Sequence, residues 1–80
     1  MQKIVSNPAI LGGKAIIKGT RLSVDFILQL LASGTTYEEI LEDYPHITLE
    51  DIQACLEFAA RSLKNDIYLE VERAEWILLL

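Results

Sequence analysis

Thr36-Tyr37-Glu38-Glu39 and Thr48-Leu49-Glu50-Asp51 carry the same helix-start pattern, twelve positions apart in a chain of 80 residues. Each places a hydroxyl side chain three residues before a carboxylate, so that both side chains can bond the free backbone donors of a first helical turn. Between them, Tyr44-Pro45-His46-Ile47 should end one helix, because Pro45 lacks an N–H group and disfavours helical backbone at the residue before it. A short helix, a tight turn and a longer helix predict a helix-turn-helix.

The other helix limits are also marked by single residues. Ser23 is the expected cap of a first helix over residues 24–33, and Gly34 is the residue that should end it. The third helix is expected to run from residue 49 to about residue 64. Its apolar stripe is predicted to comprise Ile52, Cys55, Leu56, Ala59 and Leu63.

Residues 3–23 are predicted to form a β-hairpin. The expected strands are Ile10-Leu11 and Lys14-Ala15-Ile16-Ile17, with Gly12-Gly13 as the two-residue turn between them. Arg21-Leu22 should extend the sheet briefly. Because two or three short strands are only marginally stable alone, the hairpin should pack on a helix or pair with a second copy.

The domain prediction is a hairpin plus helix-turn-helix over residues 1–65, followed by an apolar tail over residues 66–80. The tail ends in five consecutive large apolar residues, which are an aggregation liability if they stay exposed. Two interpretations remain open: the tail packs on its own core or that of a second copy, or it binds another protein. In the second case the expected contact residues are Val71, Trp76, Ile77, Leu78 and Leu79.

Composition points to a partner for the protein. Hydrophobic residues make up 51% of the chain, whereas a domain of this length buries only about 60–65% of its unfolded surface. The first helix also has apolar residues on more than one side. Both observations predict a homodimer, with the first helix or the hairpin in a two-fold interface. The sequence has no apolar run of the ~20 residues that span a bilayer, no signal-peptide stretch and no disulfide framework, so the predicted location is cytoplasmic.

No catalytic constellation is visible in the sequence. His46 is the only histidine and is expected in a turn, and Cys55 is expected to be a small buried hydrophobe. Gly12-Gly13-Lys14 lacks the spacing of a phosphate-binding loop. The chain is therefore predicted not to be an enzyme, and to hold neither a metal nor a cofactor.

The charged residues are segregated along the chain, which has a net charge of −5. Residues 1–24 contain four bases and no acid, whereas residues 25–60 contain eight acids and no base. If the protein binds DNA, the phosphate attraction must come from the basic arm, and base reading from the start of the third helix. The candidate DNA-binding residues are Lys14, Lys18 and Arg21 on the arm, and Thr48 and Gln53 on the helix.

Glu50 and Asp51 should oppose this binding by facing phosphates. The alternative is that the segregated charges are solvated surfaces.

Three motifs occur in a specific order: Gly12-Gly13-Lys14, Lys18-Gly19-Thr20-Arg21 and Tyr44-Pro45. Together with Thr48-Leu49-Glu50-Asp51-Ile52, they closely resemble the domain of unknown function 433 family over about residues 3–63. The resemblance implies a mainly α, homeodomain-like three-helix helix-turn-helix with a small N-terminal β-hairpin, from a bacterium or archaeon. It further implies a type II antitoxin encoded beside a PIN-like ribonuclease toxin.

Two functional hypotheses follow. In the first, the protein is an antitoxin that neutralises a PIN-like ribonuclease and binds its own promoter DNA through the helix-turn-helix. In the second, it is a dimeric protein-interaction module without DNA-binding activity.

Overall fold

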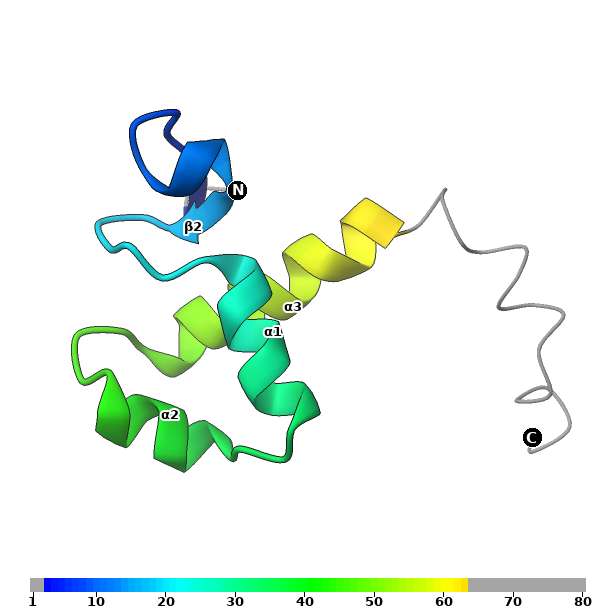
Figure 1. Cartoon of the computed structure of the whole chain (residues 1–80). Coiled ribbons are helices and arrows are strands. Elements are labelled where there is room, and N and C mark those ends of the chain that lie inside the picture. Colours follow the sequence, from blue (N-terminus) through cyan, green and yellow to red (C-terminus); the bar gives the residue numbers. More distant parts are fainter. Residues whose placement is uncertain (1–2, 64–80) are drawn as a thin grey trace, which may run out of the picture.

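The computed structural model describes residues 3–63 and contains three helices and a two-stranded sheet. The elements are β1 (Ile4–Ser6), β2 (Ala15–Ile17), α1 (Val24–Ala32), α2 (Tyr37–Asp43) and α3 (Leu49–Leu63). In Figure 1 the hairpin and α2 lie at opposite ends of the body, with α1 and α3 crossing between them and the last turns of α3 extending beyond α1. This arrangement confirms the predicted fold class, a mainly α helix-turn-helix with an N-terminal hairpin. The predicted tail, residues 66–80, lies outside the described residues.

The hairpin uses a different first strand from the one predicted. β1 pairs antiparallel with β2 in the register Ile4↔Ile17, Val5↔Ile16 and Ser6↔Ala15, so the prediction of a strand at Ile10-Leu11 was wrong. This register buries both Ile4 and Ile17. Gly12-Gly13 is not a two-residue turn but part of a single 3₁₀ turn, Leu11–Gly13, in the longer connection between the strands.

The short extension of the sheet is close to the one expected. The Ile17 N–H donates to the Leu22 carbonyl over 2.9 Å, and an isolated bridge joins Ile16 to Ser23. The chain therefore enters α1 directly from the edge of the hairpin.

The ends of α1 match their sequence signals. The Ser23 hydroxyl oxygen accepts a hydrogen bond from the Phe26 N–H over 2.9 Å. At the other end Gly34 has a φ of +96°, a conformation that favours glycine. The Gly34 N–H donates to the Leu31 carbonyl and the Thr35 N–H to the Leu30 carbonyl, both over 3.0 Å. This pair of bonds is a Schellman motif and sets the direction in which the chain leaves α1.

The two helix-start patterns both form capping boxes. For α2, the Glu39 N–H donates to the Thr36 hydroxyl over 3.1 Å, and the Thr36 N–H donates to the Glu39 carboxylate over 2.8 Å. For α3, the corresponding distances between Thr48 and Asp51 are 3.2 Å and 2.9 Å. The sequence therefore located the starts of both helices of the helix-turn-helix correctly.

The core is a single cluster of buried side chains to which both strands and all three α-helices contribute. Nine buried residues form it: Ile4, Ile17, Val24, Ile27, Ile40, Ile47, Ile52, Ala54 and Cys55. The predicted stripe of α3 was therefore only partly right. Ile52 and Cys55 are fully buried, but Leu56 and Leu63 are exposed, because the core side of α3 is turned toward Ala54 and Phe58 instead.

Removing the cap of α3 should weaken the fold. Thr48→Ala leaves the Asp51 N–H without its side-chain acceptor, and we expect it to lower the free energy of unfolding by about 1 kcal/mol. Urea denaturation followed by circular dichroism measures the change. Thr48→Ser keeps the hydroxyl and is the matched control, which should stay near wild type. Equal midpoints for Thr48→Ala and wild type would contradict the role of this cap.

Burial of Cys55 should make stability depend on alkaline pH. Desolvation, with a smaller contribution from Asp51, raises the pKa of the Cys55 thiol from 9.0 to about 11. The unfolded chain therefore ionises its thiol first, and the stability that Cys55 provides should fall between about pH 9 and pH 11. Urea denaturation across this range measures the effect, with Cys55→Ala as the control for the titration of lysines and tyrosines. A constant difference between the two proteins over the range would contradict it.

Candidate interaction surfaces

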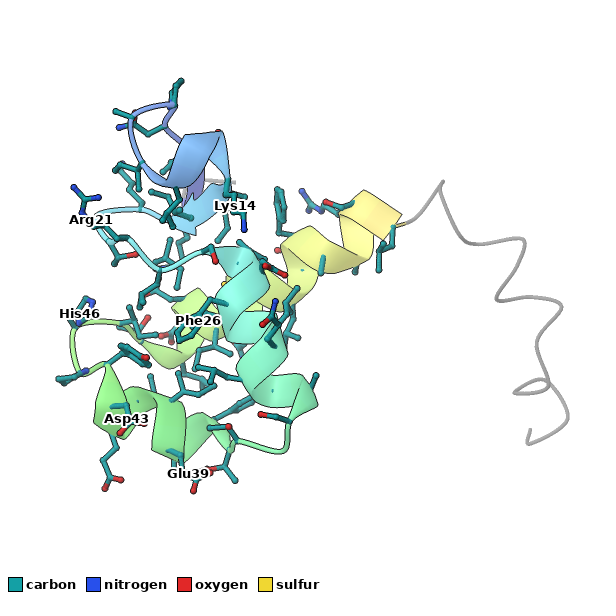
Figure 2. All side chains as sticks on the ribbon, in the orientation of Figure 1. Lys14, Arg21, Phe26, Glu39, Asp43 and His46 are labelled. Atoms are coloured by element: carbon teal, nitrogen blue, oxygen red, sulfur yellow. The ribbon has the colours of Figure 1, made fainter. Side chains whose placement is uncertain are left out.

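The three predicted arm cations differ in their surroundings. Lys14 and Arg21 both line one surface hollow, which Asp25 also borders. Lys14 forms an exposed ion pair with Asp25 at the start of α1, over 3.8 Å. Figure 2 shows Arg21 projecting on the same side of the molecule as His46. Lys18 lies next to Lys3, because its N–H donates to the Lys3 carbonyl over 2.8 Å. Lys14 thus differs from the other two bases because it is paired with an acid, although it shares a hollow with Arg21.

Lys3 connects the first strand to the start of α3. Its ammonium lies 3.4 Å from the Asp51 carboxylate, and the Asp51 side chain is only 14% exposed. The same carboxylate accepts from the Thr48 N–H, so it serves both a cap and an ion pair. The carboxylate that was expected to repel phosphates is thus paired and largely buried. Glu50, by contrast, is exposed.

The predicted base-reading residues lie at the exposed start of α3. Thr48 and Gln53 are both exposed, but the Thr48 hydroxyl is already engaged in the capping box. The outward side of α3 also carries Leu49 and Leu56, which are among the most exposed large apolar side chains within residues 3–63. This surface is apolar and acidic rather than cationic, which is unfavourable for a helix lying against phosphates.

A surface hollow lies between the hairpin and the turn that precedes α3. Residues lining it include Thr20, Arg21, Tyr44 and His46. Arg21 lies between β2 and α1, and His46 lies in the turn before α3. The fold therefore brings these two residues to one side of the molecule. Within residues 3–63, neither Lys18 nor Arg21 is in an ion pair, so both are available to an anionic partner.

An apolar groove lies on the other side, between α1 and the second half of α3. Its volume is about 380 Å³, and the Lys14–Asp25 ion pair stands at its edge. The apolar side chains that line it are Ala15, Val24, Leu28, Phe58, Ala59 and Leu63. We call this surface the α1–α3 groove.

The described part of the chain offers no metal centre and no membrane-spanning helix. No group of three His, Cys, Asp or Glu residues within residues 3–63 is placed to hold a metal ion. The acids of α2, which include Glu39 and Asp43, point outward at the end of the body away from the hairpin (Figure 2). None of the helices in this range combines the length and apolar character needed to cross a bilayer.

Two features escaped the sequence analysis for different reasons. No local pattern relates Lys3 to Asp51, since they are far apart in the chain and meet only in the folded protein. The exposed leucines of α3 had a visible signal, because Leu49, Leu56 and Leu63 recur every seven residues. What the sequence could not reveal is which side of α3 faces the core.

The chain is similar to known proteins over most of the described region. The family model "Protein of unknown function (DUF433)" matches residues 4–59. The uncharacterized protein y4eO of Sinorhizobium fredii is 36% identical over 50 residues, which is 62% of this chain but 23% of that relative. This chain thus spans about a quarter of its curated relative's length.

A solved structure agrees with the fold. The crystal structure of a DUF433 member protein from Anabaena variabilis matches with a TM-score of 0.71 and 28% sequence identity. The match covers 89% of this chain and 69% of that one. The family model spans the hairpin, α1, α2 and most of α3. Its span and this structural match together establish that the chain belongs to the DUF433 family.

Proposed function

We propose that this protein is a cytoplasmic antitoxin that binds and neutralises a PIN-like ribonuclease, and that it is a binding protein rather than an enzyme. The observation that carries the proposal is the α1–α3 groove, an open apolar surface with an ion pair at its edge. Open apolar surfaces rimmed by polar groups on small proteins commonly mark protein-interaction sites. The antitoxin role itself comes from the resemblance to the DUF433 family.

Charge supports the same partner class. The chain carries a net charge of −5, and the acids within residues 25–60 are distributed over all three helices. A ribonuclease needs cationic surface to hold RNA phosphates. An acidic protein with an apolar groove can therefore approach such an enzyme under electrostatic attraction and bind through apolar contact.

A charge placed in the groove should prevent toxin binding. Leu28 lines the groove from α1 and is only partly buried, so Leu28→Lys adds a charge with limited damage to the core. We expect a loss of affinity of at least tenfold for the ribonuclease encoded beside the protein, measured by calorimetry, because the apolar contact would bury an unpaired charge. Tyr37→Lys changes an exposed apolar residue on α2 and is the control. Wild-type affinity in Leu28→Lys would remove the groove from the proposal.

The tail remains a predicted second contact, through Val71, Trp76, Ile77, Leu78 and Leu79, which lie outside the described residues. Removal of residues 66–80 is expected to leave the body folded and dimeric but to abolish toxin neutralisation, which is measured by cell growth and by binding. A truncated protein that unfolds would make the tail part of the core. One that folds and still neutralises the toxin would leave the α1–α3 groove as the contact.

Promoter DNA is a second candidate partner, supported by the cations near the start of α3. Lys18 and Arg21 are exposed, and Lys3 neutralises Asp51, which lowers the repulsion expected at this end of α3. Such a site would attract phosphates through the arm, and Gln53 would be the base-reading side chain on α3.

The difference in ion pairing among the arm cations makes the DNA proposal testable. The double variant Lys18→Ala/Arg21→Ala should lower affinity for the protein's own promoter on any sequence and reduce the log–log salt slope by about two. Lys14→Ala is the matched control, because Lys14 is already paired with Asp25, and its slope should be nearly unchanged. Fluorescence anisotropy over a range of salt concentrations measures both. Wild-type binding by the double variant would reject a DNA role for the arm.

A further inference from the structure

The exposed apolar side chains of this protein are patterned rather than scattered. Five large apolar side chains within residues 3–63 stand out as exposed, and three of them lie on α3. Leu49 is 39% exposed, Leu56 38% and Leu63 49%. Successive members are seven residues apart, about two helical turns, so they share one side of α3. We call these three residues the leucine stripe.

We propose that a second copy of this chain covers the leucine stripe, with the two α3 helices packed antiparallel about a two-fold axis at Leu56. A seven-residue repeat is the spacing with which two helices pack side chains into each other along a seam. Leu56 is the midpoint of α3, which runs from Leu49 to Leu63. A two-fold axis through Leu56 therefore brings Leu49 of one copy to Leu63 of the other, so the stripe is complementary to itself.

The charges of α3 select the antiparallel orientation. Its first turn carries the exposed Glu50, besides Asp51, which is paired with Lys3. Its last turn carries the exposed Arg61, which also contacts Glu57 over 3.0 Å. Antiparallel packing places the acidic end of each helix beside the basic end of the other and opposes the two helix dipoles. Parallel packing would place Glu50 beside Glu50. Exposed charges of this kind contribute little affinity, but they discriminate between orientations.

Small neighbours permit the close approach that the seam requires. Ala60 is exposed one turn after Leu56, and Ala59 is only partly buried. Under the same two-fold axis, Gln53 of one copy falls opposite Ala59 of the other, so a long side chain meets a short one. Leu63 and Ala59 belong to both the leucine stripe side of α3 and the α1–α3 groove. The two contacts are still tested separately, because Leu56 lies outside the groove and Leu28 lies outside the stripe.

Cysteine cross-linking tests both the interface and its orientation. In an antiparallel pair the two Leu56 positions meet at the axis, whereas the two Leu49 positions lie about 21 Å apart, beyond the reach of a disulfide. Leu56→Cys should therefore form a disulfide dimer with itself under mild oxidation. Leu49→Cys and Leu63→Cys should not do so separately but should cross-link when mixed. The native Cys55 is buried, so the wild-type protein is the blank.

Each outcome of the cross-linking decides the matter. Self-linked dimers of all three variants would mean parallel helices and would overturn the proposal, as would the absence of any dimer. Light scattering of the full chain at micromolar concentration gives an independent measurement: wild type should be dimeric and Leu56→Glu monomeric, with an unchanged circular dichroism spectrum. Tyr37→Glu, an exposed apolar site away from the stripe, should stay dimeric. A monomeric wild type or a dimeric Leu56→Glu would overturn the proposal.

Discussion

The fold depends on the burial of one isoleucine from each segment of a very small core. Each fully buried side chain of this kind contributes roughly 1.5–3 kcal/mol, while a whole domain is stable by only about 5–15 kcal/mol. The β-branched side chain also has few rotamers, so each isoleucine presents a nearly fixed shape to the others. The six that meet in the core cluster are Ile4, Ile17, Ile27, Ile40, Ile47 and Ile52.

This core explains which parts of the fold the sequence could predict. The helix ends follow from interactions within a few residues, so Ser23, Gly34, Thr36 and Thr48 were sufficient to place them. The hairpin register depends instead on burying Ile4 against the helices. A local turn signal at Gly12-Gly13 was therefore misleading, because it competed with a tertiary requirement that no short window contains.

The candidate surfaces were predictable to a smaller extent. The arm cations could be named from the sequence, but only the fold shows that Lys14 is paired with Asp25 and that Lys18 and Arg21 are in no ion pair within residues 3–63. The spacing of the leucines was legible in the sequence, yet the same spacing fits a buried stripe. Whether the leucines are buried or exposed depends on the rotation of α3 about its axis. That rotation follows from the packing of Ile52 and Cys55 in the core. The proposed helix pairing and base reading by Gln53 would compete for the same outward side of α3.

The Lys3–Asp51 ion pair has a practical consequence for anyone preparing this protein. It brings Lys3 to within a side chain's length of the first turn of α3. An affinity tag or fluorescent fusion placed directly before residue 3 would thus emerge beside that turn and beside Lys18, where it could obstruct a partner by bulk alone. Binding assays on this face are best made after any such tag or fusion has been removed.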